Sequence, residues 1–321
     1  MLKSRMALEA FEENGRTHLG ESYHNAPYKM VHYGDKKLHQ HLEMIMMSAS
    51  PGMMEGDELE IDIKVKANAH LRLYTQSFNK IHPMKEKGAL QLTKVRMEEH
   101  SMLHFIPHPV TPYEGSIFKT VNELEIPKSA CLIWGDIIAS GRVTKGESFQ
   151  FKSLHSVTKL KVDGSLVLYD NQLLQPSDIP IQSLLHYEGF THQATLIYTS
   201  PFGDQLKEEL DEILAGQYQE ITFGFTSCGP NSVMLRALGN DGELLYEWMT
   251  AMGRLCWEYT LHKKEEEKIQ KDLNSPAEIQ QPKLEKTPIE LQSGKQSKNT
   301  ETRARHAGKT KSKKKKSVLS A

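Results

Sequence analysis

The stretch at residues 59–75 alternates apolar and polar side chains on both sides of a short turn at residues 67–69. Successive side chains of a β-strand point to opposite faces, so the alternation predicts two strands, each with one buried and one solvated face. The apolar positions that would share the buried face are Leu59, Ile61, Ile63, Val65, Leu71 and Leu73.

The same pattern of strand, turn and strand returns at residues 90–105, 121–134 and 149–168. The repeat of roughly 30 residues lies in the range that is typical of stacked architectures. The sequence therefore predicts a mainly β fold of stacked, helically arranged strand layers, a solenoid-like β body. Consecutive hairpins of an ordinary β-sandwich fit the pattern as an alternative.

Helical spacing is expected at both ends of the chain. Residues 1–20 are polar with weak helical spacing, which predicts a frayed start or a short helix. About two α-helices are expected in the C-terminal third. Leu206, Leu210 and Ile213 share one face of the first, with Asp204 as its N-cap, and Asp241 would cap the second.

The second helix carries one stripe of large apolar side chains at spacings of three or four. Such a stripe is usually part of a core, but a terminal helix that is rich in Trp and Met is also a common docking face for a partner. The candidate partner-binding residues are Trp248, Met252, Leu255 and Tyr259.

The charges are distributed unevenly along a chain of 321 residues with a net charge of −1. Residues 263–321 carry 16 Lys and Arg against 8 Asp and Glu, which leaves 24 against 33 in residues 1–262. We expect residues 1–262 to form the folded domain and residues 263–321 a disordered, low-complexity basic tail. An acidic domain is unsuited to nucleic-acid binding.

The composition favours a cytoplasmic location. No apolar run approaches the roughly 20 residues that span a bilayer, so no membrane segment is expected. The first residues lack the apolar core of a secretory signal. The three cysteines, at positions 131, 228 and 256, are scattered, which favours a reducing compartment over a disulfide framework.

Motifs for catalysis or tight metal binding are missing from the sequence. It has no Cys-x₂-Cys or His-Glu-x₂-His pattern, no phosphate-binding loop and no nucleophile elbow. Among the 15 histidines, those at positions 70, 82, 104, 108 and 155 are expected mostly at strand ends or on the solvated face. We therefore expect a protein that is not an enzyme and binds no cofactor stably. Polar residues at strand ends could instead ring one end of the stack.

Five short motifs of this kind follow one another in the order found in the urease accessory protein family UreD, also called UreH. The chain resembles that family over about residues 23–259. The residues that carry the resemblance are Gly56 and Asp57; Thr75, Gln76 and Ser77; Pro107 and Pro109; Gly141, Arg142, Gly146 and Glu147; and, late in the chain, residues 235–239.

The resemblance implies a non-catalytic scaffold for nickel insertion into apo-urease. Family members act with UreF and the GTPase UreG, and a dimeric hetero-complex with UreF is expected, with the C-terminal helix as its contact. Nickel would be handled transiently, through a polar passage for which Asp57, Gln76 and Glu147 are the candidate lining residues. Two alternatives stay open: a β-stacked carbohydrate-active enzyme, which would need paired carboxylates, and a direct nickel-storage protein, which would need clustered ligands.

Overall fold

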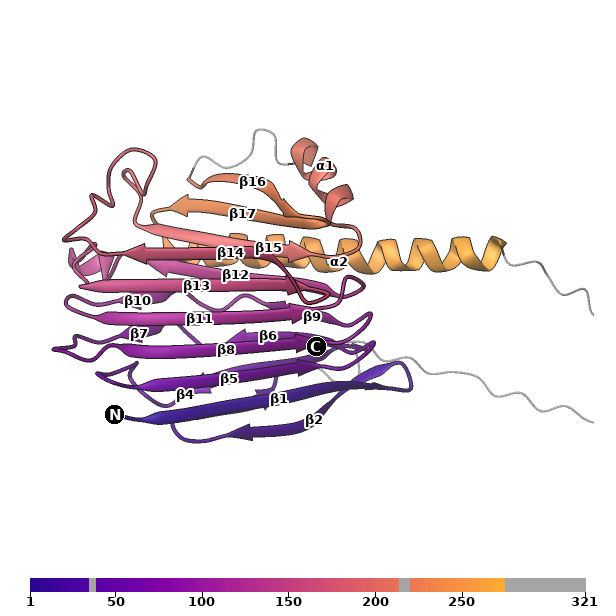
Figure 1. Ribbon diagram of the computed structural model, residues 1–321, viewed down its shortest axis with the longest axis horizontal. Helices are drawn as coiled ribbons and strands as arrows, with labels where there is room; N and C mark the ends of the chain where they lie inside the picture. The colour runs from indigo at the N-terminus through magenta and orange to yellow at the C-terminus, as the bar shows by residue number, and fades with distance from the viewer. Residues whose placement is uncertain (35–38, 214–219, 275–321) are drawn as a thin grey trace, which may run out of the picture. The chain divides into compact units, whose positions relative to one another are not determined.

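Two β-sheets that face each other across a shared core make up most of the chain (Figure 1). The structure, a computed structural model, describes residues 1–34, 39–213 and 220–274, without the side chains of 211–213. Within these ranges it contains seventeen β-strands, two α-helices and one 3-10 turn, η1 (Val143–Lys145). The expectation that the chain is mainly β is confirmed.

Sheet A consists of seven strands. They are β1 (Lys3–Glu13), β2 (Arg16–His24), β5 (Glu58–Val65), β8 (Ala89–Met97), β11 (Ile117–Ile126), β13 (Ser153–Val162) and β14 (Ser165–Leu174). Their order across the sheet is β14-β13-β11-β8-β5-β1-β2. The pairs between β1 and β13 are parallel, and the outermost pairs at both edges are antiparallel.

Sheet B consists of ten strands. They are β3 (Tyr28–His32), β4 (Leu42–Ser48), β6 (His70–Thr75), β7 (Asn79–Ile81), β9 (Met102–Phe105), β10 (Val110–Pro112), β12 (Cys131–Ala139), β15 (His192–Thr199), β16 (Thr222–Gly229) and β17 (Ser232–Gly239). The main order is β16-β17-β15-β12-β9-β6-β4-β3, and β7 and β10 form a short ladder that joins this sheet where β10 pairs with β12.

The chain winds between the sheets as a β-solenoid of about four turns. It leaves sheet A through three arcs of similar length, at residues 66–69, 98–101 and 127–130, and enters sheet B at β6, β9 and β12. Each strand then pairs in parallel with its counterpart in the next turn; Leu90, for example, lies between Glu58 and Lys119.

This winding confirms the stacked-layer prediction and excludes the sandwich of consecutive hairpins. The two strands of the stretch at 59–75, β5 and β6, belong to different sheets and are joined by an arc. Their apolar side chains meet in the core between the sheets, for example Ile63 with Leu71 and Leu73, all 1% exposed or less. Two strands show the same alternation of apolar and polar residues whether a hairpin or an arc joins them. The sequence was therefore compatible with both architectures.

The expectation of a frayed or helical start is wrong. Residues 1–20 lie largely in β1 and β2, and β1 adds in parallel to β5 as the first layer of sheet A. Met6, Leu8 and Ala10 are buried at alternate positions. This spacing of two was present in the sequence, and burial against the next layer decides it in favour of a strand.

Two helices occur in the C-terminal third, as expected: α1 (Gly203–Ile213) and α2 (Gly242–Asn274). Asp241 caps α2, since its Oδ1 accepts the amides of Glu243 and Leu244 at 2.8 and 3.0 Å. Asp204 is not the cap of α1: it lies in the first turn and its Oδ2 accepts the amide of Asn231 at 3.3 Å.

The expected boundary after residue 262 falls inside α2, which continues to Asn274. The last turns of the helix run past the edge of the sheets (Figure 1). The rest of the expected tail, residues 275–321, lies outside the described residues. In the part of the chain that is described, no helix is both long and apolar enough to cross a membrane.

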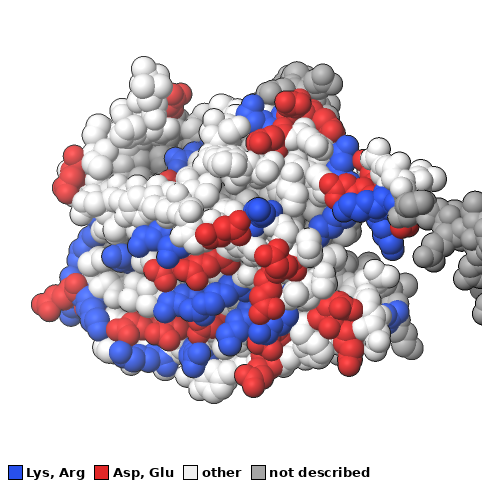
Figure 2. All heavy atoms as spheres, turned by 45° about the vertical axis from the view of Figure 1, so that its right-hand side comes forward, with Lys and Arg blue, Asp and Glu red and all other residues white. Residues whose placement is uncertain are grey.

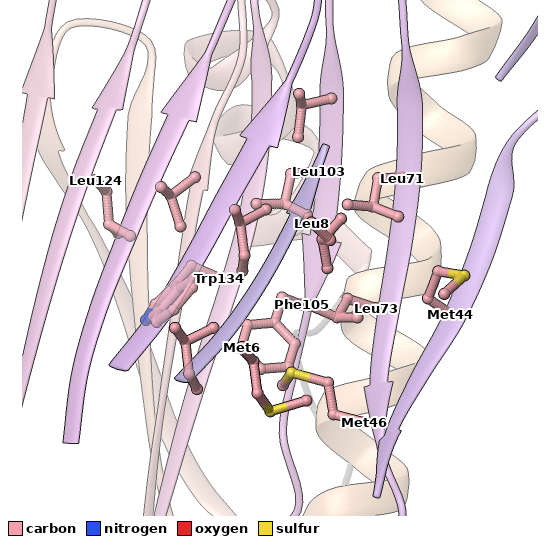
Figure 3. Packing of buried hydrophobic residues seen from close by; sticks show 14 of the residues in the cluster. Met6, Leu8, Met44, Met46, Leu71, Leu73, Leu103, Phe105, Leu124 and Trp134 are labelled. Carbon is pink, nitrogen blue, oxygen red and sulfur yellow. The ribbon is translucent and has the colours of Figure 1, made fainter. Parts of the chain in front are cut away.

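Three apolar clusters hold the described part of the chain together, and the two largest lie on opposite faces of sheet B. The larger lies between the sheets in the first turns, where side chains of both sheets interdigitate (Figure 3). The second lies on the other face of sheet B, under α2. The outer face of sheet A is solvated and carries rows of both charge signs (Figure 2). Ion pairs such as Arg5–Asp62, at 3.0 Å, join neighbouring strands there.

Candidate functional site

The first four sequence motifs occupy equivalent positions in successive turns. Apart from Thr75, the last residue of β6, they fall in the connections that lead from sheet B back to sheet A, at residues 49–57, 76–88, 106–116 and 140–152. These connections are longer than the opposite arcs and contain β7, β10 and η1. The motifs therefore form one side of the solenoid, which we name the motif side.

Backbone hydrogen bonds stack these connections on one another. Met53 N donates to Lys80 O at 2.8 Å, Tyr113 N donates to Ile81 O at 2.9 Å, and Gly115 N donates to Gln150 O at 2.9 Å. Polar side chains extend the contacts between turns. One such contact is made by Thr75 Oγ1, which lies 2.9 Å from His108 Nδ1 and accepts the His108 amide at 2.8 Å.

The glycine of the fourth motif is required by this close stacking. Gly141 has φ of 145°, and a Cβ atom there would lie 2.9 Å from the carbonyl oxygen of Glu147. A side chain at this position would meet backbone rather than a movable group, so only glycine fits.

Asp57 and Glu147 are held in turns of the motif side. The Asp57 carboxylate accepts the amides of Leu2 and Met54 at 2.8 and 2.9 Å. Glu147 is buried and accepts Arg142 Nε at 2.7 Å, and the Arg142 guanidinium lies 4.3 Å from the ring centroid of Tyr113. Both carboxylates have local partners that account for them, and neither lines the cavity described next.

A cavity of about 190 Å³ opens on the motif side and extends between the two sheets. Gln76, from the second motif, lies in its wall near the mouth, together with Ser50 and Asn79. Its inner end is formed by side chains of the central strands. The polar ones among them are Gln91 of β8, Thr120 and Asn122 of β11, and Asp136 of β12.

Sheet A presents two rows of polar side chains to this interior. In the first row, Gln91, Thr120, Ser156 and Gln172 are aligned across β8, β11, β13 and β14. In the second, Thr93, Asn122, Thr158 and Asp170 are aligned one rung further along the same strands. The rows continue with Leu59 and Ile61 in β5, so these two rows are apolar in the first turn and polar in the later ones.

Asp136 faces these rows from sheet B. Its Oδ2 accepts the Ser156 hydroxyl at 3.0 Å, and burial raises the pKa of the carboxyl group. In the second row, Asn122 Nδ2 donates to Thr158 Oγ1 at 3.0 Å. A carboxylate, hydroxyls and amides in this arrangement offer oxygen ligands to a passing cation, without the cluster of ligands that would hold it tightly.

The stripe on α2 lies mainly in the core beneath the helix. Trp248 and Met252 are buried against sheet B, whereas Leu255 and Tyr259 are half-buried at its margin. Tyr259 also donates to Glu209 Oε1 of α1 at 2.8 Å. A partner would have to displace α2 to reach Trp248, and a partner contact through the stripe stays a prediction.

Neither alternative function gains support from the described residues. No group of three or more His, Cys, Asp or Glu side chains in these ranges is arranged to hold a metal ion. Asp136 is the one carboxylate among the described residues that line the cavity, whereas a glycosidase needs a facing pair.

Sequence reasoning missed Thr120, Asn122 and Asp136. A signal was available for the first two, because they occupy inward positions of a strand whose flanking inward residues are Phe118 and Leu124. Polar side chains at such positions are unusual in a core and require partners. Asp136 sits in a run of apolar residues, and only the structure shows that it faces the polar rows.

Comparison with known proteins agrees with this picture. The model of the UreD urease accessory protein family matches residues 3–271. A UreD protein of Flavobacterium johnsoniae is 33% identical over 260 residues, which cover 80% of this chain and 93% of the relative. A UreD protein of Acetivibrio thermocellus is 31% identical over 244 residues, 76% of this chain and 93% of the relative. On the strength of these matches over nearly all of the described fold, the chain belongs to the UreD family of urease accessory proteins.

Proposed function

We propose that this protein acts in the cytoplasm as a non-catalytic scaffold for the insertion of nickel into apo-urease, in a complex with UreF and UreG. The family assignment supports a role in urease maturation. The nickel ion is cargo in this proposal and passes through the protein without being retained.

The observation that carries the proposal is the two rows of polar side chains inside the later solenoid turns. A β-solenoid is stabilised by stacked apolar side chains, and buried polar groups weaken it unless they are satisfied. Here two rows of them lie beside a cavity that is open on the motif side. The passage of a hydrated cation would explain why polar side chains are buried in these rows.

The candidate passage therefore differs from the one expected from the sequence. Gln76 remains at its mouth, and the interior positions are Thr120, Asn122 and Asp136. Weak contacts with hydroxyl and amide oxygens suit transit, because a closed cage of charged ligands would retain the ion.

Co-production of urease with UreF and UreG, in the presence or absence of this chain, tests the proposal. We expect urease made without the chain to lack nickel at its active sites and urease made with it to contain nickel. Equal nickel content in the two preparations would refute the maturation role. Pull-down of UreF by this chain, with urease omitted, tests the hetero-complex separately.

A further inference from the structure

An ion pair stands where the polar rows end, at the last strand of sheet A. Arg236 of β17 contacts Asp170 of β14, with 2.5 Å between Nη2 and Oδ1. This pair joins the last strand of sheet A to sheet B, where the two sheets meet beyond the cavity. Arg236 belongs to the fifth sequence motif, which lies apart from the motif side.

Strand register places this pair on the same interior face as the cavity. Asp136 pairs directly with Thr195, and Thr195 pairs directly with Arg236. Residues that are directly opposite in antiparallel strands share a face of the sheet. On sheet A, Asp170 is the last member of the second polar row. The two walls of the interior thus converge on this ion pair.

Hydrogen bonds tie the pair to the rows. Gln172 Nε2 donates to Asp170 Oδ2 at 2.9 Å, and Gln193 Nε2 donates to Gln172 Oε1 at 2.7 Å. Moving inward, Ser156 connects to Asp136 at the wall of the cavity. Ser156 and Gln172 are direct register neighbours, so polar side chains at adjacent positions line the way from the cavity to the ion pair.

The exposure of the two side chains indicates which of them can move when the ion pair separates. The Arg236 side chain is 45% exposed, whereas that of Asp170 is 15% exposed. The guanidinium can swing into solvent, and the carboxylate would stay behind in the wall. The hydroxyl of Tyr187, which is buried and has no hydrogen-bond partner in the described structure, adds an unsatisfied polar group near the charges of Asp136 and Arg236.

We propose that the Arg236–Asp170 pair is the closed gate of a second opening of the interior, so that displacing Arg236 connects the cavity with solvent at this end. The inference rests on the proposed function for its purpose, because a passage needs an exit as well as a mouth. While Arg236 is in place, its positive charge opposes the approach of a divalent cation to Asp136. With Arg236 displaced, Asp170 and Asp136 remain as two carboxyl groups along the exit.

A buried reporter thiol tests the gate without nickel or urease. Thr195→Cys places the thiol between Asp136 and Arg236, in a Cys228→Ser background that removes the partly exposed native thiol. The rate of modification by the small cationic reagent 2-aminoethyl methanethiosulfonate is then measured by mass spectrometry. The buried Cys131 and Cys256 report general unfolding in the same sample.

We expect Arg236→Ala and Asp170→Asn each to raise the rate of thiol modification at position 195 by about tenfold. In these variants the reagent reaches the thiol without prior separation of the ion pair. Arg5→Ala is the matched control, because Arg5 and Asp62 form a similarly exposed pair, 56% and 21%, on the outer face of sheet A. It should leave the rate unchanged.

Two results would overturn the gate. One is a rate in Arg236→Ala that stays within about twofold of the parent, which would mean that the pair only fastens the sheets together. The other is an equal rise at Cys131 and Cys256, which would mean global unfolding. Because the labelling involves no nickel, the gate can stand or fall independently of the maturation assay.

Discussion

At the scale of single residues, a group of histidines beneath α2 makes the fold sensitive to pH. His41, His70 and His104 lie around the indole ring of Trp257, with centroid distances of 5.5, 6.0 and 6.4 Å. The guanidinium of Arg72 lies 5.7 Å from the same ring. Neither ring nitrogen of His104 has a hydrogen-bond partner among the described residues.

Burial lowers the pKa of all three histidines, to about 4 for His70 and to about 3 for His104. The charged groups that act on them are Arg72 and Glu43 from sheet B and Arg254 and Lys264 from α2. The folded protein keeps these rings neutral, whereas the unfolded chain takes up protons near pH 6.5. Their contribution to stability is therefore full above pH 6.5 and is lost as the pH falls towards 4.

Urea unfolding at pH 7.5 and pH 5.0 measures this dependence. Each histidine that stays neutral should cost about 2 kcal/mol of unfolding free energy at the lower pH. His104→Leu should reduce the loss by that amount and leave stability at pH 7.5 unchanged or higher, because the apolar side chain needs no hydrogen-bond partner. His24→Leu, on the exposed strand β2, is the control. An unchanged pH dependence in His104→Leu would contradict the assignment.

At the scale of elements, the sequence predicted strands better than it predicted their connections. The alternation at residues 59–65 and 71–73 identified β5 and β6, because one face of each is buried. It could not tell whether they pair with each other, since that depends on the turn that joins them and on layers distant in sequence. The motif residues were found, but their stacking on one side required the register of the turns. The polar rows were missed because each strand contributes only one residue to each row. A row therefore becomes visible only when the register of the strands is known.

The helix stripe illustrates the same limit. Spacing showed that Trp248 shares a face with Met252, and the structure adds that sheet B covers this face. Trp248→Ala should lower the free energy of unfolding by about 3–5 kcal/mol, because it leaves a cavity between α2 and β16 that the backbone cannot fill. Denaturant titration measures the loss. The neighbouring exposed residue provides the control: Glu247→Ala should change stability by less than about 0.5 kcal/mol. A small effect of Trp248→Ala would mean that α2 is held mainly by other contacts.

At the scale of the whole molecule, we predict separable roles for residues 1–274 and for residues 275–321. Residues 1–274 form one compact unit that contains the cavity, the polar rows and the gate. The last turns of α2 belong to this unit, since Lys264 Nζ donates to the carbonyl oxygen of His100 at 3.1 Å. We therefore predict that a division of the chain by function falls after Asn274 rather than after residue 262.

Two truncations test this division. Removal of residues 275–321 should leave urease activation at the level of the full chain. Removal of residues 263–321 should also permit activation but lower the free energy of unfolding by about 1 kcal/mol, because the hydrogen bond of Lys264 is lost. Urease activity after co-production and thermal unfolding of the purified chains are the readouts. Loss of activation with the shorter deletion would assign the tail a necessary role.

The central claim, that nickel moves along the polar interior, is tested most directly by Asn122→Leu. The substitution keeps the size of the side chain and removes its polar atoms from the wall of the cavity. We expect the nickel content of co-produced urease to fall by about tenfold, as for the loss of one buried polar contact of about 1.4 kcal/mol. Glu123→Leu, on the exposed face of the same strand, should leave the nickel content unchanged. Full nickel loading of urease by a stably folded Asn122→Leu variant would contradict the claim.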